Sequence, residues 1–295
     1  MDAGMVAQVR RFNRVVTQRV GALDDHFLAR DRPLGEARLL WEIADGREVR
    51  ELRSALGLDS GYVSRMLRSL EAAGLVTVGP VDTDKRVRIA RLTRAGRAER
   101  AELDRRSDRL ASDLLGPLDD RQRRRLVAAM ADVERLLTAT LITVTPADPA
   151  DDRARFCLTS YVEELDRRFD GGFDPALSIS ADAEELRPPA GVLLLATVRS
   201  EPVGCTALKL HGPEAAEIKR MWVSPSARGL GVGRRLLTEI ESYAARAGVR
   251  LLRLETNDTL TEAISLYRSA GYAEVEPFSD DPYARHWFEK RLSSG

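Results

Sequence analysis

The sequence has little cysteine and no long hydrophobic run. Its two cysteines, Cys157 and Cys205, exclude a disulfide framework, and no Cys/His cluster has the spacing of a zinc site, so we expect no metal. The longest apolar stretch, 192–198, has the length of one strand, whereas a membrane-spanning helix needs roughly 20 apolar residues. The first residues contain no apolar signal core. We therefore expect a cytoplasmic protein that does not bind membranes.

The net charge is zero, but the charges are unevenly distributed. Residues 1–140 carry 27 Lys and Arg against 22 Asp and Glu, and residues 141–295 carry 19 against 24. Arginine supplies 42 of the 46 cations and is spread through both halves, so its abundance alone is weak evidence for nucleic-acid binding. The asymmetry indicates that a polyanion binds the first half rather than the second.

The length of 295 residues is about twice the ~150 of a typical domain, which predicts two domains. The stretch T-V-T-P-A-D-P-A-D-D, residues 143–152, contains two prolines and cannot continue a helix, so the boundary is placed there. We expect a mainly α-helical domain over 1–142. In residues 143–295 strands alternate with helices, which predicts an α/β domain whose first strand falls near 141–144.

The first domain begins and ends with long amphipathic helices. Apolar residues recur at spacings of three and four between Val6 and Phe27, and again between Leu126 and Leu141. Each pattern predicts one continuous helix. The apolar stripes are long enough to favour dimerisation over a monomeric bundle.

A helix-turn-helix is predicted within residues 48–73. Val49, Leu52 and Leu56 share one helix face, Gly57 to Asp59 break the helix, and a second apolar face starts at Val63. Hydroxyls and guanidinium groups on the outer face of the second helix suit contacts to phosphates and guanine edges. The predicted DNA contacts of this helix are Ser60, Gly61, Tyr62, Ser64, Arg65 and Arg68.

A β-hairpin follows the second helix. Its strands are predicted at 75–79 and 87–92, and the polar connection between them contains Lys85 and Arg86. A cationic hairpin tip can enter a minor groove or lie along a phosphate backbone. Helix-turn-helix and hairpin together predict a winged helix.

The segment D-T-D-K-R-V-R-I-A-R-L-T-R-A-G, residues 82–96, resembles the wing signature of MarR-family transcription regulators. Residues 5–140 follow the layout of that family. The resemblance implies a homodimer that is formed by the first helix and the last two, and that binds an operator in double-stranded DNA. It also implies that Asp84 orients Arg86 in the wing.

The strongest chemical signal in the second domain is E-I-K-R-M-W-V-S-P-S-A-R-G-L-G-V-G-R-R-L-L, residues 217–237. A strand, a turn and a glycine-rich segment lead into an amphipathic helix. Glycines 229, 231 and 233 leave amide groups accessible beside a helix N-terminus, which suits a pyrophosphate, and Arg228 and Arg234 add positive charge. Three strands precede the segment and no G-K-[ST] is present, which argues against a Rossmann site and a P-loop.

Two motifs resemble the GNAT superfamily of N-acetyltransferases. Arg228, Gly231 and Gly233 match its motif A, Q/R-x-x-G-x-G/A, and L-E-T-N-D-T-L-T-E-A-I-S-L-Y-R-S-A-G-Y, residues 254–272, resembles its motif B. The resemblance covers 145–295. It implies acetyl-CoA as cofactor, an amine acceptor, and a mixed sheet in which the strands at 217–223 and 250–256 splay apart. The implied coenzyme-binding residues are Met221, Trp222, Val223, Arg228, Gly229, Leu230, Gly231, Val232, Gly233, Arg234, Asn257, Ala263, Leu266 and Tyr267.

The resemblance also suggests catalytic roles. Tyr267 occupies the position of the acid that protonates the leaving thiolate. Glu217 is the first candidate for the base that deprotonates the amine and Glu255 the second, although Glu255 could instead pair with Arg253 or Lys219. The family places its acceptor site in the C-terminal segment, where an acid and aromatic residues suit a cationic or amino-acid-like acceptor. The candidates there are Phe278, Asp280, Tyr283 and His286.

These expectations favour a bifunctional regulator and acetyltransferase. One alternative is a DNA-binding regulator whose second domain only senses acyl-CoA without turnover. Another is an acetyltransferase whose winged helix is only a dimer scaffold, although the polar recognition positions argue against that.

Overall fold

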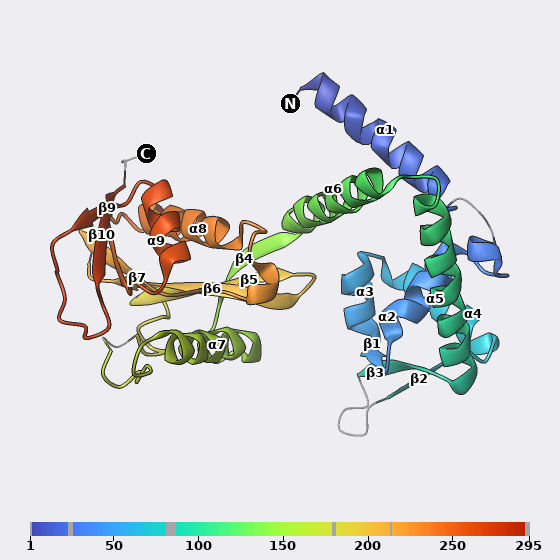
Figure 1. The fold of residues 1–295 in the computed structure, drawn as a ribbon. Coiled ribbons are helices and arrows are strands. Elements are labelled where there is room, and N and C mark those ends of the chain that lie inside the picture. Colours follow the sequence, from blue (N-terminus) through green and yellow to red (C-terminus); the bar gives the residue numbers. More distant parts are fainter. Residues whose placement is uncertain (1, 23–25, 81–86, 179–180, 213, 293–295) are drawn as a thin grey trace. The chain divides into compact units, whose positions relative to one another are not determined.

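The computed structural model describes residues 2–22, 26–80, 87–178, 181–212 and 214–292. The chain forms two compact units, Met1–Ala129 and Met130–Gly295, which are described separately below (Figure 1). In the described residues, no helix is both long and apolar enough to cross a membrane.

The first unit is mainly helical and contains a small sheet. Its three strands lie in the order β1-β3-β2 and are antiparallel. Helix α6 begins in this unit and ends in the second. The elements are α1 (Ala3–Arg19), η1 (Phe27–Ala29), α2 (Leu34–Ile43), β1 (Arg47–Glu48), α3 (Val49–Leu56), α4 (Ser60–Ala72), β2 (Val76–Pro80), β3 (Arg88–Leu92), α5 (Arg94–Leu115) and α6 (Asp120–Ala139).

The first helix is shorter than its apolar pattern predicts. Helix α1 ends at Arg19, and Gly21 takes a left-handed conformation with φ of 64°, so the expectation of one helix as far as Phe27 is wrong. Glycine adopts this conformation without steric cost and commonly ends helices. Phe27 lies instead in η1, where its ring packs edge-on against Trp41 at 6.3 Å.

The helix-turn-helix and the hairpin strands are confirmed. Gly57 ends α3 with a left-handed φ of 63°, and the Asp59 side chain caps α4 by accepting a 2.9 Å hydrogen bond from the amide of Tyr62. Helix α4 then buries Val63 and Leu70. Strands β2 and β3 pair antiparallel as predicted. The hairpin tip, with Asp84, Lys85 and Arg86, lies outside the described residues.

The second unit is a seven-stranded mixed sheet with helices on both faces. The strand order is β4-β5-β6-β7-β8-β10-β9, and the β7–β8 pair is parallel while the others are antiparallel. Helices α8 and α9 cover one face and α7 covers the other (Figure 1). The elements are β4 (Ile142–Ala147), α7 (Asp152–Arg168), β5 (Gly191–Val198), β6 (Glu201–Leu210), β7 (Ala215–Val223), η2 (Pro225–Ala227), α8 (Val232–Arg246), β8 (Leu251–Thr256), α9 (Thr261–Ser269), β9 (Ala273–Val275) and β10 (His286–Arg291).

The segment expected to contain the domain boundary begins with a strand. Strand β4 pairs with β5 from Ile142–Val198 to Ala147–Leu193, so most of 143–147 is part of the sheet rather than a connection between domains. Pro146 fits there because β4 is an edge strand, where a residue without an amide donor is tolerated. The expected first strand near 141–144 is confirmed and extends further.

Strands β7 and β8 separate soon after they meet. They pair only from Ala215–Leu251 to Glu217–Arg253, although β7 continues to Val223 and β8 to Thr256. Beyond Glu217 the two strands diverge, which leaves polar backbone groups of both strands without ladder partners on the facing sides. The splayed sheet implied by the motif resemblance is thus present.

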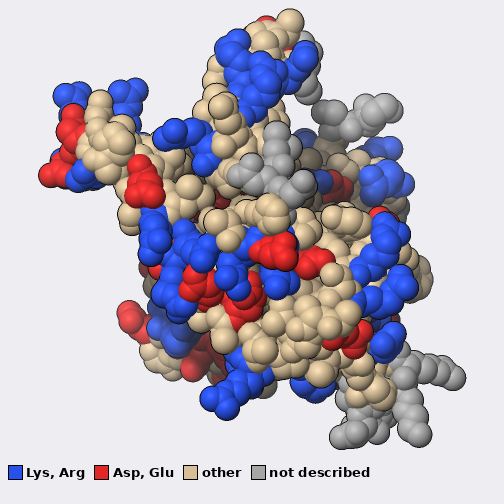
Figure 2. Space-filling model, turned by 90° about the vertical axis from the view of Figure 1, so that its right-hand side faces the viewer, with Lys and Arg blue, Asp and Glu red and all other residues tan. Residues whose placement is uncertain are grey.

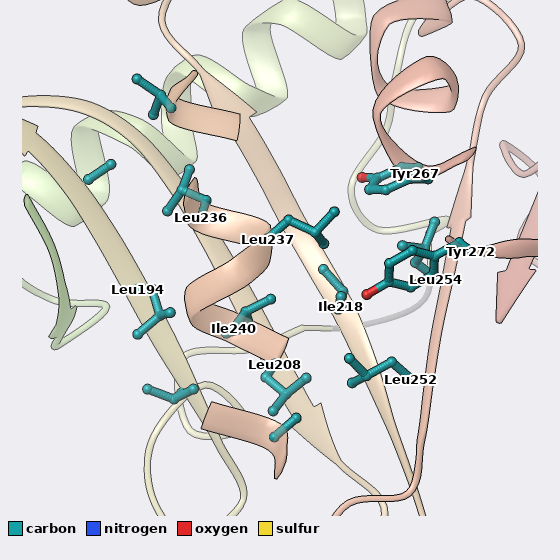
Figure 3. Close-up of a cluster of buried hydrophobic side chains, with 14 of the residues drawn as sticks. Leu194, Leu208, Ile218, Leu236, Leu237, Ile240, Leu252, Leu254, Tyr267 and Tyr272 are labelled. Carbon is teal, nitrogen blue, oxygen red and sulfur yellow. The ribbon is translucent and has the colours of Figure 1, made fainter. Parts of the chain in front are cut away.

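The main core of this unit lies between α8 and the sheet. Leu236, Leu237 and Ile240 of α8 are at most 1% exposed and pack toward Leu208 and Ile218 of the strands (Figure 3). Each such buried side chain stabilises the fold by about 1.5–3 kcal/mol. The buried face of α8 therefore holds its N-terminus at a defined place beside the end of β7.

Charges of both signs share the surface. On the face shown in Figure 2, basic and acidic side chains are interspersed. Much of this charge is engaged locally, as in the ion pair from Arg30 to the buried Glu99, which lowers the pKa of Glu99 against the effect of burial. Part of the arginine content therefore serves ion pairs within the chain.

Replacing Gly96 with alanine should destabilise the first unit. Gly96 lies in the first turn of α5, and a Cβ atom there would be 2.0 Å from the carbonyl oxygen of Leu75. Because backbone would have to move, we expect a loss of about 1–3 kcal/mol or more. Amide exchange measured by mass spectrometry should show faster exchange in α5 and β2. Gly79→Ala is the control, since no atom lies within 4 Å of its Cβ position. Equal protection in both variants would contradict this packing.

Candidate functional site

A cleft of about 490 Å³ opens where β7 and β8 diverge. Its walls come from the end of β7, the start of α8, one face of α9 and the facing side of α7. Most of the predicted coenzyme-binding residues meet there. Those in its lining are Met221, Trp222, Val223, Arg228, Gly229, Gly231, Val232, Gly233, Arg234, Ala263, Leu266 and Tyr267.

Two predicted coenzyme contacts lie elsewhere. Leu230 packs against the hydrophobic core. Asn257 lines a neighbouring cavity, and its side chain is engaged by the chain itself: its amide donates to the carbonyl of Tyr283 at 2.8 Å, and its oxygen accepts from both the amide and the hydroxyl of Thr259. In this structure Asn257 holds the loop after β8 to the loop before β10.

The glycine-rich segment forms an anion cradle. Gly229 and Gly231 have left-handed φ values of 79° and 80°, and Gly231 precedes α8 without any side chain capping the helix. The first amides of an uncapped helix lack intrahelical acceptors and carry the positive end of the helix dipole. No atom lies within 4 Å of a Cβ position at Gly231, so the space in front of these amides is open. The cradle fits the diphosphate of coenzyme A.

The two arginines of the cradle have protein partners. Arg228 pairs with Glu164 of α7 at 2.5 Å, and Arg234 donates to the hydroxyl of Ser269. Burial opposes ionisation of Glu164, but hydrogen bonds from Arg228, Trp222 and Arg168 outweigh it and lower its pKa. Glu164 therefore stays ionised and anchors Arg228 at the edge of the cleft. No motif marks Glu164 in the sequence; it belongs to an amphipathic helix whose partner is decided by packing.

Tyr267 lies where the cleft meets a second cavity and lines both. Its side chain is 5% exposed, and its hydroxyl lies 3.5 Å from the sulfur of Met221. Figure 3 shows the ring entering the core from α9 beside Tyr272. Burial raises the pKa of Tyr267, so the phenol keeps its proton at neutral pH. The position and protonation state suit a proton donor.

The second cavity, of about 90 Å³, adjoins the cleft between the diverging strands. Phe169, Phe173 and Tyr283 form one wall, with ring centroids 4.8–5.7 Å apart. Arg220 and Asp281 also line it. Sequence reasoning assigned no site role to these residues except Tyr283. Tyr161 and Phe169 were recognisable only as part of the apolar face of a helix.

The two candidate bases occupy different places. Glu255 lines the second cavity, with Lys219 Nζ 2.6 Å from one oxygen and the hydroxyl of Ser279 on the other. The expected alternative, an ion pair with Lys219, is therefore present, whereas Arg253 pairs with Glu289. Glu217 pairs with Lys219 at 3.4 Å where β7 and β8 are still joined, and lines neither cavity.

Of the four predicted acceptor residues, Tyr283 lines the second cavity. Phe278 packs under the guanidinium of Arg253, Asp280 is exposed, and His286 bonds to Glu274 at 2.6 Å. These three are absent from the lining. The neighbouring Asp281 takes the place expected for Asp280, because Asp281 is 8% exposed and accepts hydrogen bonds from Ser178 Oγ and the amide of Tyr283.

In the first unit, α4 presents its predicted DNA contacts to solvent. Residues 60, 61, 62, 64, 65 and 68 are all exposed, while the opposite face of the helix is buried. The guanidinium of Arg65 lies 5.6 Å from the ring centre of Tyr62, so these two side chains form one cationic and aromatic surface. Arg68 donates to the carbonyl of Ser64 at 3.2 Å.

Comparison with known proteins identifies both halves. Residues 158–272 match the model of the acetyltransferase (GNAT) family, and residues 31–87 match that of the MarR family. A protein of Azospirillum brasilense named IAA acetyltransferase is 35% identical over 143 residues, which cover 48% of this chain and 90% of that protein. An uncharacterized N-acetyltransferase of Schizosaccharomyces pombe is 38% identical over 32% of this chain and 60% of its own length.

Solved structures are similar to the second half. An aminoglycoside 6'-N-acetyltransferase complexed with coenzyme A is 17% identical, with a TM-score of 0.40 over 50% of this chain and 96% of that one. A GNAT-family acetyltransferase of Staphylococcus aureus is also 17% identical, with a TM-score of 0.39 over 52% of this chain and 99% of that one. The chain belongs to the acetyltransferase (GNAT) family, with acetyl-CoA as cofactor, and its N-terminal half contains a MarR-family domain.

Proposed function

We propose that the chain is a bifunctional protein, a DNA-binding transcription regulator that also transfers acetyl groups from acetyl-CoA to an amine. The observation that carries the enzymatic part is the position of Tyr267. This buried, protonated phenol lies between the cleft beside the glycine-rich cradle and the second cavity. A domain that only senses acyl-CoA needs neither a proton donor at that junction nor an acceptor cavity.

Coenzyme binding is assigned to the cleft. The uncapped amides that follow Gly231 would hold the diphosphate, and Arg234 lies on the same helix turn. The backbone of Met221 to Val223 faces the gap left by β8 and can hydrogen-bond the pantetheine arm and the acyl carbonyl. Acetyl-CoA supplies the acyl group as a thioester, the acceptor supplies the amine, and the chain supplies the groups that bind them and move protons.

The second cavity is assigned to the acceptor amine. The amine must lose a proton before or as it attacks, and Glu255 is the carboxylate of the candidate pair that lines this cavity. Lys219 Nζ, 2.6 Å from one oxygen of Glu255, orients that carboxylate. Tyr267 donates a proton to the leaving sulfur. Glu217 pairs with Lys219 but lines neither cavity, so we assign it no contact with the amine.

The first unit is assigned to operator binding. The exposed face of α4 carries hydroxyl, aromatic and guanidinium groups, which suits a recognition helix in a major groove. The solvent-facing apolar residues of α1 and α6 support the further proposal of a homodimer, since such stripes are stabilised when a second copy covers them. These residues are Val6, Val9, Phe12, Val16, Val127, Met130 and Leu137.

Tyr267→Phe should lower kcat for acetyl-CoA-dependent acetylation by about 10²–10⁴-fold, the range expected for loss of a general acid. The affinity for acetyl-CoA should change little, because the cradle is untouched. The measurement is thiol release from acetyl-CoA with a panel of amines, together with calorimetric binding of the coenzyme.

Tyr272→Phe is the control, since that buried ring packs 5.9 Å from Tyr267 without lining either cavity. An unchanged rate in Tyr267→Phe would remove Tyr267 from catalysis, and no thiol release by the native protein would refute the turnover.

Gly231→Glu should abolish acetyl-CoA binding. The substitution adds a side chain and a negative charge in front of the uncapped amides of α8. Gly248→Glu is a matched control, because Gly248 follows the other end of the same helix with φ of 81° and likewise has open space around its Cβ position. Both variants carry the same backbone strain and charge. Equal calorimetric affinity for acetyl-CoA in the two variants would overturn the assignment of the cradle.

Arg65→Ala should weaken binding to duplex DNA from the region upstream of the chain's own gene. If Arg65 contacts a phosphate, its loss should reduce the steepness of the plot of log binding constant against log salt concentration by about one. If it contacts a base, its loss should cost about 1–3 kcal/mol of binding free energy. Electrophoretic shifts at several salt concentrations measure both. Arg250→Ala, which removes an exposed arginine from the second unit, should bind as the native protein does. No shift of any duplex at low salt would refute the regulator.

A further inference from the structure

We propose that the acceptor is a small α-amino acid with a short apolar side chain, and that Arg220 binds its carboxylate. The inference rests on the proposed acetyl transfer and specifies the substrate class of the second cavity. It depends on a strained arginine, a set of aromatic rings and two carboxylates that line one space.

Arg220 is directed into the cavity by a bulge in β7. Cys205 pairs with Trp222 and Ala207 pairs with Lys219, so Thr206 alone faces both Arg220 and Met221. Arg220 adopts a left-handed φ of 56°, which costs a residue other than glycine roughly 1–2 kcal/mol. Bulges of this kind redirect side chains beside active sites. A glycine would adopt this conformation without the cost, but it would leave the cavity without the guanidinium group.

The positive charge of Arg220 has no counter-ion in the described part of the chain. The side chain is half-buried, and its guanidinium lies 5.6 Å from the ring centre of Tyr161. The adjacent Lys219, by contrast, pairs with Glu255 and Glu217. A partly desolvated guanidinium beside a substrate cavity favours an anion, and its planar fork matches a carboxylate in two hydrogen bonds.

The rest of the cavity suits the other parts of an amino acid. Asp281 and Glu255 line it as well, and their carboxylates suit the amino group before it loses its proton. Phe169, Phe173 and Tyr283 offer an apolar wall for a side chain. A second positive charge on the acceptor is disfavoured by Arg220, whereas the charge of Lys219 is balanced by its ion pairs. The volume of about 90 Å³, against about 490 Å³ for the coenzyme cleft, favours a small molecule over a peptide segment.

The reaction requires no further reagent. The amino nitrogen forms a bond to the acetyl carbon, and the bond between that carbon and the thioester sulfur breaks. Starting from the ammonium form, the amino group first releases one proton to solvent by way of Glu255. As the neutral nitrogen attacks, it loses a second proton to Glu255, and the departing sulfur gains one from Tyr267. The proton on Glu255 then returns to Tyr267 through solvent, so one proton is released overall. The products are an N-acetylamino acid and free coenzyme A.

The test compares acceptors that differ only in the carboxylate. Thiol release from acetyl-CoA is measured with L-alanine, L-alaninamide and ethylamine, and with L-valine and 2-methylpropylamine. We expect kcat/KM to be about 10–100-fold higher for each amino acid than for its decarboxylated amine, mainly through KM. Arg220→Gln should reduce this preference at least about tenfold, and Arg220→Lys should restore part of it.

Arg199→Gln is the matched control. Arg199 also has a left-handed φ, of 51°, but it is exposed in the turn before β6 and lines neither cavity. It should keep the full preference for amino acids. Unchanged calorimetric binding of acetyl-CoA to Arg220→Gln would show that the variant is folded.

The outcomes separate the two proposals. If amines without a carboxylate react as well as the amino acids, the inference about Arg220 is overturned and acetyl transfer stands. If no amine releases thiol, acetyl transfer is overturned, and calorimetry with L-alanine in the presence of coenzyme A decides the inference. Binding to the native protein that is lost in Arg220→Gln would support it, and no binding to the native protein would overturn it.

Discussion

The early separation of β7 from β8 is the constraint on which the catalytic half depends. A parallel pair that continued past Glu217 would bury its backbone groups in a ladder and fill the space that the two cavities occupy. The divergence instead leaves a gap bounded by α8 on one side and α7 on the other. The cleft that we assign to the coenzyme and the cavity that we assign to the acceptor open from this gap, and Tyr267 lines both.

The glycine-rich segment and the bulge border that gap because tertiary packing fixes the helices and strands that carry them. The apolar face of α8 anchors the helix to the sheet, so its uncapped N-terminus faces the end of β7. Glu164 reaches across from α7 to Arg228 and Trp222, and so ties the opposite wall to the cradle. The bulge in β7 places Arg220 in the lining of the second cavity, while the neighbouring Lys219 is paired with Glu255. The two adjacent cations therefore differ: Arg220 has a strained backbone and no ion pair in the described residues, whereas Lys219 has an ordinary backbone and an ion pair.

Most helices and strands, and the helix break at Gly57, could be predicted because each depends on residues that are neighbours along the chain. The helix break at Gly57 and the glycine-rich start of the helix after Gly231 follow from local backbone preferences. The end of α1 was mispredicted because its apolar periodicity continues through Gly21, where the backbone turns. Likewise, Pro146 indicated a break, although an edge strand accepts proline.

The sequence by itself determined the two-domain organisation, the helix-turn-helix and the glycine-rich start of α8, since short-range spacing encodes all three. The tertiary structure alone decided which residues line the second cavity. Tyr161, Arg220 and Asp281 lie on three separate segments, and nothing in their local sequence indicates that they meet. It also distinguished Glu255 from Glu217 and Asp281 from Asp280, because the direction of each side chain depends on strand register and loop packing rather than on composition.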